Sequence, residues 1–185
     1  SNPTGSIYSR EELEALSEVI RTSDRDIYVI SDEIYEYINF AGRHESIAQF
    51  EGLKDKVIIV NGVSKGYAMT GWRIGYIAAP PEIASACAKL QGQVTSGACS
   101  IAQKAAVAAI RSGKEPARKM TQAFLRRRNL VLEKIEQIQG FKQYTPQGAF
   151  YLFPDVSERF GSKINGREIN NAEDLCFYLL EQANV

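Results

Sequence analysis

Residues 57–76 read VIIVNGVSKGYAMTGWRIGY, and this stretch decides how the rest of the chain can be arranged. Val57–Val60 is apolar throughout, which predicts a strand, and Lys65 follows shortly after its end. Open α/β sheets place their ligand sites at the carboxyl edge of the strands. A lysine amine that is desolvated at such an edge can attack a carbonyl carbon. The stretch therefore predicts an α/β fold with a reactive Lys65, although a solvated surface lysine is the plainer interpretation when Lys65 is considered alone.

The composition is that of an ordinary globular protein. Hydrophobic residues make up 44% and charged residues 24% of the 185 positions, and the formal net charge is zero. A chain without net charge gives no indication of a nucleic-acid partner. No apolar run approaches the ~20 residues that a membrane helix needs, and no signal-peptide pattern opens the chain. We therefore expect neither a nucleic-acid nor a membrane partner.

Cysteine and histidine are too few and too scattered for several kinds of site. Cys87, Cys99 and Cys176 lie far apart and form no Cys-x-x-Cys motif. This pattern favours reduced thiols in a cytoplasmic protein and argues against a zinc site or a disulfide framework. His44 is the only histidine and lies in a polar loop, so we expect it to be solvated. A histidine-based metal site and a Ser-His-Asp triad are both disfavoured.

Apolar periodicity predicts helices and strands that alternate along the chain. The expected helices span 10–23, 82–91, 100–111, 117–139 and 172–182, and the expected strands span 27–30, 57–60, 74–79 and 150–153. Such alternation predicts the α/β class, with a mostly parallel sheet between helices. The residues after about 117 have the pattern of a smaller α+β unit, which divides the chain into 1–117 and 118–185.

Local signals support several of these boundaries. Ser9 and Glu12 form the pattern of a capping box before the first helix. The run 27–30 is apolar without alternation, which is typical of a strand buried on both faces. Gly140 suits the C-terminal cap of the longest helix, and Asn171 suits the N-cap of the last one.

Polar side chains gather at the expected edge of the sheet. They belong to Asn2, Asp32, Tyr35, Ser64, Lys65 and Arg73. The lysine amine can condense with an aldehyde, and a serine hydroxyl with an arginine guanidinium can hold a phosphate. The aspartate can keep a ring nitrogen protonated, and the tyrosine and asparagine can hydrogen-bond a phenolic oxygen. An aldehyde, a phosphate, a pyridine nitrogen and a phenolate together describe pyridoxal 5'-phosphate.

Four motifs in a fixed order strengthen this interpretation. They are Asn2–Gly5 (NPTG), Ser31–Tyr35 (SDEIY), Ser64–Lys65 with Gly71–Tyr76 (GWRIGY), and Gly148–Pro154 (GAFYLFP). With these motifs the chain resembles the aspartate-aminotransferase family, which has fold type I among the pyridoxal-phosphate enzymes, and specifically the prokaryotic-type branch of class I. The resemblance extends over essentially the whole chain, whereas each motif alone would be weak evidence.

The resemblance implies a transfer of amino groups in amino-acid metabolism. The amino donor would be aspartate or one of a broad range of amino acids, and the acceptor a 2-oxo acid such as 2-oxoglutarate. Lys65 would form a Schiff base with the cofactor and, once displaced, shuttle a proton. Asp32 would pair with the ring nitrogen, which makes the ring an electron sink. The full-length protein would be a homodimer with shared active sites.

The resemblance also implies how the cofactor is bound. Tyr35 and Asn2 would contact its phenolic oxygen, with Asn2 also near the substrate carboxylate. Ser64 and Arg73 would bind phosphate oxygens. Residues 1–117 would belong to a large cofactor-binding domain, whereas 118–185 would be an incomplete small domain with a bridging helix.

Two positions depart from the family's pattern. Gly62 stands where many relatives carry a second phosphate-binding serine, and Gly97-Ala98 stands where relatives often have Asn-Pro. The second position lies in a loop that approaches the partner subunit's cofactor in the family dimer. Neither departure touches the core chemistry.

The two ends of the sequence suggest a fragment. The chain opens directly on a turn and stops at Val185, close to the end of an expected helix. The arginine that binds the substrate carboxylate in the family would lie beyond Val185. We therefore expect the isolated chain to bind the cofactor weakly and to lack appreciable turnover.

Two other functions remain open on these residues. A β-lyase or a cyclopropane-forming synthase would use the same fold and the same lysine. A non-catalytic cofactor-sensing domain of a transcription regulator would retain the site without the reaction. A nucleotide-binding module is disfavoured, because no Gly-x-Gly-x-x-Gly or phosphate-loop motif follows a predicted strand.

Overall fold

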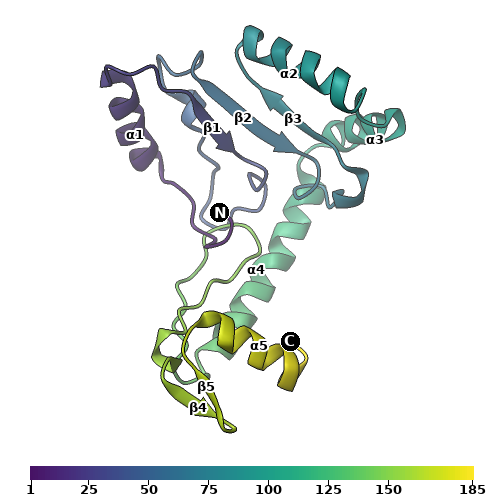
Figure 1. Cartoon of the computed structure of the whole chain (residues 1–185). Coiled ribbons are helices and arrows are strands. Elements are labelled where there is room, and N and C mark those ends of the chain that lie inside the picture. Colours follow the sequence, from purple (N-terminus) through teal and green to yellow (C-terminus); the bar gives the residue numbers. More distant parts are fainter.

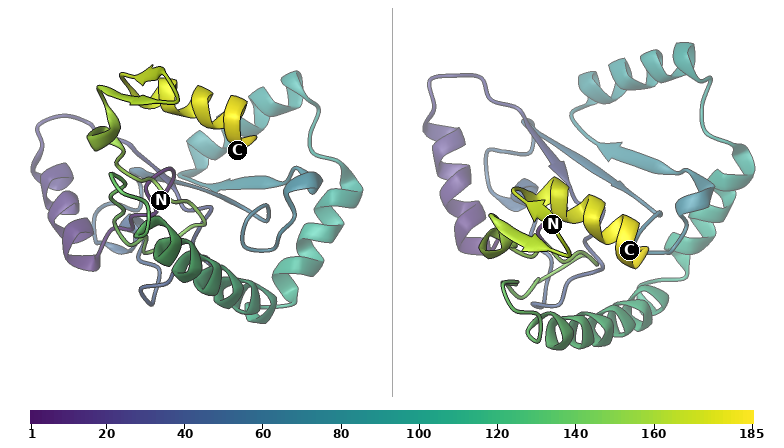
Figure 2. Two further views of the ribbon diagram at one scale, coloured as in Figure 1. Left: turned by 90° about the horizontal axis from the view of Figure 1, so that it is seen from below. Right: turned by 60° about the horizontal axis from the view of Figure 1, so that its bottom comes forward.

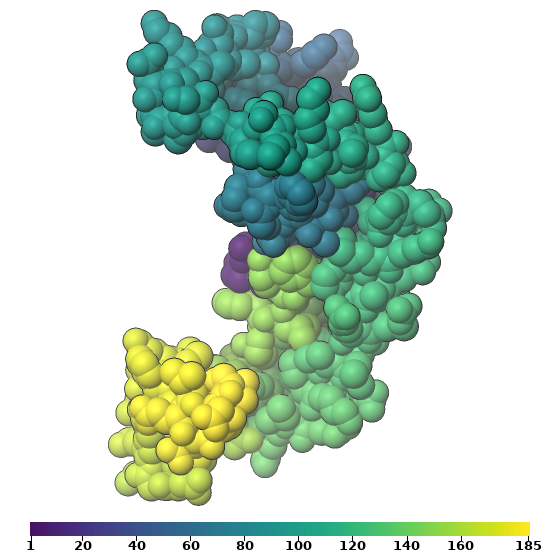
Figure 3. Space-filling model, turned by 90° about the vertical axis from the view of Figure 1, so that its right-hand side faces the viewer, coloured from purple at the N-terminus to yellow at the C-terminus, as the bar shows by residue number.

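The computed structural model describes all 185 residues. Figure 1 shows a three-stranded sheet at one end of the molecule and a two-stranded sheet at the other, with the long helix α4 (Glu115–Ile135) running between them. Both views in Figure 2 agree that α4 follows one side of the molecule. In the space-filling view the outline is curved, with a hollow between α5 (Ala172–Ala183) and the sheet end (Figure 3).

The larger sheet has the strand order β1-β2-β3. Strand β1 (Val29–Asp32) is parallel to β2 (Val57–Gly62), and β3 (Gly75–Ala78) is antiparallel to β2. The alternation of helices and strands agrees with the expected α/β class. Within these residues the sheet is nevertheless mixed, because the connection from β2 to β3 contains only the 3-10 turn Thr70–Trp72 and no crossover helix of the kind that usually joins parallel strands.

The remaining helices lie close to their predicted positions. Helix α1 spans Arg10–Thr22, α2 spans Pro81–Val94, and α3 spans Ser100–Arg111. The capping box before α1 is present, and the side chain of Asn171 accepts a hydrogen bond from the first turn of α5. None of the helices combines the length and the apolar character needed to cross a membrane.

The other short elements complete the chain. Strands β4 (Ser162–Ile164) and β5 (Arg167–Ile169) form an antiparallel hairpin beside α5. Single 3-10 turns occupy Ile47–Gln49, Thr70–Trp72 and Ser157–Arg159.

Helix α4 is held to the sheet end by a side chain in its first half. The hydroxyl of Thr121 donates a hydrogen bond of 2.6 Å to the backbone oxygen of Tyr37, and the backbone oxygen of Ala117 lies 3.0 Å from the same hydroxyl. The helix ends at Ile135, four residues before its expected end at 139, and a turn then leads to Gly140 with φ +79°. Gly140 therefore terminates this turn and does not cap the helix directly.

The predicted strand over 150–153 is wrong. Only isolated bridges flank it, one joining Asn39 to Gly148 and one joining Lys142 to Asp155. The chain turns at Ala149, where φ is +58°, and this left-handed conformation interrupts an extended strand. The aromatic side chains that suggested a strand pack instead against the rings of Tyr35 and Phe124.

Strand β1 is not buried on both faces as predicted. Val29 packs against the core below α1, but Tyr28 is 50% exposed and Ile30 is 72% exposed. The reason is that successive side chains of a strand point to opposite faces, and only one face of β1 is covered in this chain.

Two apolar clusters hold the sheet end together. The first contains Leu13, Ile47, Leu53 and Val57, and it fixes α1 against β2. The second consists of Tyr35, Ile38 and Ala149, all buried, with partly buried aromatic rings around them. This second cluster joins the turn after β1 to the GAFYLFP segment, which is more than a hundred residues away in the sequence.

Gly62, at the end of β2, is required by the close approach of β3. A Cβ atom at this position would lie 2.7 Å from the carbonyl oxygen of Ile74 and 3.1 Å from the Cα atom of Gly75. These neighbours are backbone atoms, so they can move away only by distorting the strand pair.

We expect Gly62→Ala to destabilise the full-length protein by ~1–3 kcal/mol, because the added methyl group overpacks the β2–β3 contact. The measurement is the unfolding midpoint in denaturant. Gly92→Ala in α2 is the matched control, since a Cβ there meets no atom within 4 Å and alanine is the better helix former. The explanation is wrong if both variants unfold at the same midpoint.

Candidate functional site

The carboxyl ends of β1 and β2 and the start of β3 meet at one edge of the sheet. In the register, Asp32 pairs with Val60 and Gly62 pairs with Gly75. A cavity of about 430 Å³ opens at this edge. Four of the six predicted site residues line it, namely Asp32, Ser64, Lys65 and Arg73.

Lys65 lies between the sheet edge and two aromatic rings. Its Nζ atom is 5.9 Å from the centre of the Tyr35 ring and 5.5 Å from the centre of the Phe150 ring, both within cation–π range. The next residue, Gly66, turns closely against Tyr37, where a Cβ atom would lie 2.4 Å from a ring carbon. The lysine side chain is half-buried and is therefore not the solvated surface lysine of the alternative interpretation.

The loop that carries Lys65 is strained at two positions. Ala68 and Arg73 both have φ +54°, a left-handed conformation that costs free energy for residues other than glycine. Arg73 closes the 3-10 turn after this loop, and its Nη1 atom donates a hydrogen bond of 2.9 Å to the carbonyl oxygen of Thr70. This bond uses one of the guanidinium donors and leaves the others available to a ligand.

Asp32 is the last residue of β1, and its side chain is exposed. One carboxylate oxygen accepts a hydrogen bond of 3.1 Å from the backbone N–H of Ile34, which fixes the carboxylate at the start of the turn. The second oxygen remains available to a cationic group in the cavity.

Tyr35 is buried, 9% exposed, at the centre of the second apolar cluster. Its hydroxyl oxygen lies 2.5 Å from the hydroxyl oxygen of Tyr151. Burial first, and then the hydrogen bond with Tyr151, raises the pKa of Tyr35 well above its ordinary value. The hydroxyl is therefore a neutral group that can both donate and accept a hydrogen bond at neutral pH.

Two predicted site residues, Asn2 and Tyr35, do not line the lysine cavity, although the ring of Tyr35 lies within 5.9 Å of the Lys65 Nζ atom. Asn2 is the one for which the structure shows no contact with Lys65. It lies exposed in the opening turn, which Gly5 closes by donating a backbone hydrogen bond of 2.6 Å to Ser1. The carbonyl oxygen of Gly5 accepts two further bonds, from the backbone of Gln147 and Gly148. The opening turn is thus anchored to the GAFYLFP segment, beside the cluster around Tyr35.

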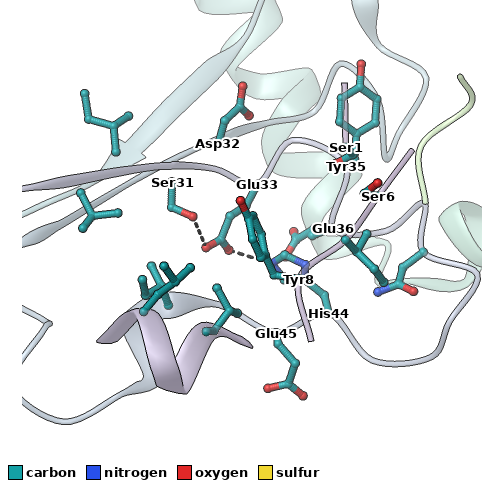
Figure 4. A pocket seen from close by; sticks show the side chains of 17 residues that line it. Ser1, Ser6, Tyr8, Ser31, Asp32, Glu33, Tyr35, Glu36, His44 and Glu45 are labelled. Carbon is teal, nitrogen blue, oxygen red and sulfur yellow. Dashed lines mark hydrogen bonds and ion pairs between the residues drawn. The ribbon is translucent and has the colours of Figure 1, made fainter. Parts of the chain in front are cut away.

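A polar network on the other side of β1 was missed by sequence reasoning. In Figure 4 the side chains of Asp32 and Glu33 point in opposite directions, and Glu33 faces a second cavity of about 320 Å³. The carboxylate of Glu33 accepts hydrogen bonds from the hydroxyls of Ser31 (3.0 Å) and Ser46 (2.6 Å). His44 Nε2 lies 2.9 Å from its other oxygen.

His44 is therefore not solvated as expected. Its side chain is only 29% exposed and pairs with Glu33, whose side chain is 8% exposed. Burial opposes the charged form of Glu33, but the hydrogen bonds from His44 and Ser46 outweigh it and lower the pKa of the carboxyl group. The same bond raises the pKa of His44. The only sequence signal was that Ser31 and Glu33, two apart on a strand end, share a face.

The whole chain is similar to known proteins. The family model described as "Aminotransferase class I and II" matches residues 1–185. An aspartate aminotransferase from Geobacillus stearothermophilus is 49% identical over 187 residues, covering 100% of this chain and 46% of that protein. A bifunctional aspartate aminotransferase and glutamate/aspartate-prephenate aminotransferase from Petunia hybrida is 48% identical over 190 residues, covering 100% of this chain and 40% of that protein.

Solved structures give the same picture. The aspartate aminotransferase from Rhizobium meliloti superposes with a TM-score of 0.94 at 40% identity, covering 100% of this chain and 47% of that one. An aromatic aminotransferase from Pyrococcus horikoshii superposes with a TM-score of 0.85 at 33% identity. The chain spans less than half the length of these relatives.

The Glu33–His44 pair should make stability depend on pH. Because folding lowers the pKa of Glu33, its contribution is present above the ordinary value of 4.5 and is lost as the pH falls through the folded value. Because folding raises the pKa of His44, its contribution is complete below the ordinary value of 6.5 and is lost as the pH rises through the folded value. The pair therefore stabilises most between pH 4.5 and 6.5.

We expect Glu33→Gln to lower the thermal unfolding midpoint of the full-length protein more at about pH 6 than at about pH 9, where His44 is neutral. Glu133→Gln, which changes an exposed carboxylate on α4, is the control and should behave alike at both values. An equal loss for Glu33→Gln at the two pH values would show that the ion pair contributes nothing.

Proposed function

The chain belongs to the class I and II aminotransferase family, and from this premise we propose that the whole protein is a pyridoxal-phosphate-dependent aminotransferase. The observation that carries the proposal is the single cavity lined by Asp32, Ser64, Lys65 and Arg73. An amine, a carboxylate, a hydroxyl and a guanidinium group are the partners that an aldehyde, a protonated ring nitrogen and a phosphate require. The donor set of the cavity therefore fits the cofactor.

Lys65 is proposed as the catalytic residue. Its Nζ atom would hold the cofactor through the aldehyde carbon and, as a free amine, would accept and return the proton of the substrate's α carbon. Pyridoxal phosphate, when bound, supplies an electron sink for the carbanion that loss of this proton creates. The carboxylate of Asp32 would keep the ring nitrogen protonated, which is the condition for that sink.

The other four residues are proposed to bind and orient. Ser64 and Arg73 would hold the phosphate, the arginine with the donors that its bond to Thr70 leaves free. The neutral hydroxyl of Tyr35 would donate to the phenolic oxygen. Asn2 would contact the same oxygen and the substrate carboxylate, and the anchoring of its turn beside Gly148 supports this proposal.

The names of the relatives guide the choice of substrate. Several are named aspartate aminotransferases, and some of these names also include prephenate. We therefore propose aspartate as the amino donor and a 2-oxo acid such as 2-oxoglutarate as the acceptor. A β-lyase with the same site would release its product without leaving the amino group on the cofactor, so the two activities are separable.

The organisation of the whole protein is likewise a proposal. Residues 1–117 would belong to a large cofactor-binding domain and 118–185 to a small domain, with α4 as the bridging helix. A homodimer in the cytoplasm is proposed for the full-length protein. Exposed apolar side chains on α2 and α3, such as Leu90, Val94 and Ile101, support a surface that other parts of the assembly cover.

We expect Lys65→Arg to slow the half-reaction of the full-length protein with aspartate by about 10²–10⁴-fold, because arginine cannot serve as the proton-transferring amine. The measurement is the change in cofactor absorbance after mixing with aspartate. Lys54→Arg, at an exposed position outside the cavity, should leave the rate unchanged. Comparable rates for Lys65→Arg and the parent protein would refute the role of Lys65.

We also expect residues 1–185 alone to hold the cofactor weakly, because Asp32 and Arg73 are exposed in this chain. Borohydride reduction of a cofactor-soaked sample, followed by peptide mapping, should label Lys65 far below one equivalent. The full-length protein, treated in parallel, should be labelled close to completion. Stoichiometric labelling of the short chain would contradict this expectation.

A further inference from the structure

We propose that Tyr151 is a positioning residue for the cofactor site, where its hydroxyl group holds and polarises the hydroxyl group of Tyr35. The two oxygen atoms lie 2.5 Å apart although the residues are separated by 116 positions. The proposal deepens the proposed function and rests on it, because Tyr35 is the group through which Tyr151 would act.

The surroundings show that this contact is built into the fold. The ring of Tyr35 lies edge-on to the rings of Phe150 and Tyr151, with centre-to-centre distances of 5.5 and 5.7 Å. Phe124 of α4 packs against Phe150 with a centre-to-centre distance of 5.3 Å. The two rings that carry the hydroxyls therefore belong to one cluster with Phe150 and Phe124, which is built from three separate parts of the chain.

Backbone hydrogen bonds hold the segment that carries Tyr151. Ala149 is fully buried and donates a backbone hydrogen bond of 2.8 Å to Ile38, three residues after Tyr35. Gly148 forms the bridge to Asn39, and a Cβ atom at Gly148 would lie 3.0 Å from the carbonyl oxygen of Ile38. The segment that carries Tyr151 is thus bonded directly to the turn that carries Tyr35.

The hydrogen-bonding capacity of two phenols determines which hydroxyl of the pair donates and which accepts. A phenol has one hydrogen to donate and lone pairs that accept. If Tyr35 donates its hydrogen to the cofactor's phenolic oxygen, its own oxygen accepts the hydrogen of Tyr151. A chain of two such bonds polarises its members, so Tyr35 becomes a stronger donor. Tyr151 would therefore act on the cofactor without touching it.

Lys65 gives the pair its place in the site. The lysine Nζ atom lies over the ring of Tyr35, which carries one hydroxyl of the pair, and over the neighbouring ring of Phe150. A displacement of the Tyr35 hydroxyl would therefore occur next to the reactive amine.

The test uses the full-length protein loaded with pyridoxal phosphate. Tyr151→Phe removes one oxygen atom and keeps the ring packing, so we expect the pH midpoint of the cofactor's visible absorbance change to rise by about half a unit to one unit. The reason is that a weaker Tyr35 donor lets the phenolic oxygen hold its proton more tightly. Tyr144→Phe is the control, since Tyr144 is 85% exposed, and its midpoint should equal that of the parent protein.

A double-mutant cycle separates positioning from general packing. In a Tyr35→Phe background, Tyr151→Phe should cause no further shift of the midpoint, because the group through which it acts is gone. Equal and additive shifts in the two backgrounds would overturn the proposal, as would a Tyr151→Phe midpoint equal to that of the parent protein.

A second measurement does not need the cofactor. In the cofactor-free full-length protein with ¹³Cζ-labelled tyrosine, Tyr151→Phe should change the Tyr35 chemical shift at neutral pH, whereas Tyr144→Phe should not. An unchanged Tyr35 chemical shift would contradict the hydrogen bond between the hydroxyls of Tyr35 and Tyr151. If the parent protein shows no absorbance band with pyridoxal phosphate, the proposed function fails, and with it the role of Tyr151 toward the cofactor. A different result, a normal absorbance band whose pH midpoint Tyr151→Phe does not change, would overturn only the role of Tyr151.

Discussion

The contact between Gly62 and the start of β3 is the constraint on which the site depends. Strand β2 is bonded to β1 on one side and to β3 on the other, so its end sets the position of both neighbours. Because Gly62 has no side chain, the backbone of Ile74 and Gly75 can occupy space that a Cβ atom at this position would need. This approach brings Arg73 to the same cavity as Ser64 and Lys65. In this chain, a residue with a Cβ atom at the end of β2 would have to displace the backbone at the start of β3.

The segment from Asp32 to Tyr35 is supported from two sides by different kinds of interaction. On one side the carboxylate of Glu33 is held by Ser31, His44 and Ser46. On the other side Tyr35 is enclosed by aromatic rings and bonded to Tyr151. Charged hydrogen bonds resist rotation of the backbone, whereas ring packing excludes water around the phenol. Together they hold a short turn that has little regular structure of its own.

Sequence reasoning located the features whose cause is local. The capping box of α1, the start of β2 and the lysine that follows this strand are all encoded within a few neighbouring residues. Sequence reasoning failed where contacts between distant parts of the chain determine the structure. Phe150 lies outside any strand because Ala149 turns and the ring packs on Tyr35, and His44 is half-buried because its partner Glu33 lies across the turn after β1. The direction of β3 could not be predicted for a related reason, since periodicity indicates which residues are buried and not which way a strand runs.

Helix α4 has a consequence for how the two ends of the molecule can move relative to each other. It is a rod of 21 residues, hence about 30 Å long, held near its start by the bond between Thr121 and Tyr37. Further along, the ring of Phe124 packs on Phe150, and Arg128 donates a hydrogen bond of 2.8 Å to the carbonyl oxygen of Pro146. Only about 10 Å of helix extends beyond Arg128. A rotation of this free end by about 10° would displace it by about 2 Å, and the chain that follows it leads to the β4–β5 hairpin and α5. Motion between the two ends of the molecule is therefore expected at the last two turns of α4 and not at the sheet.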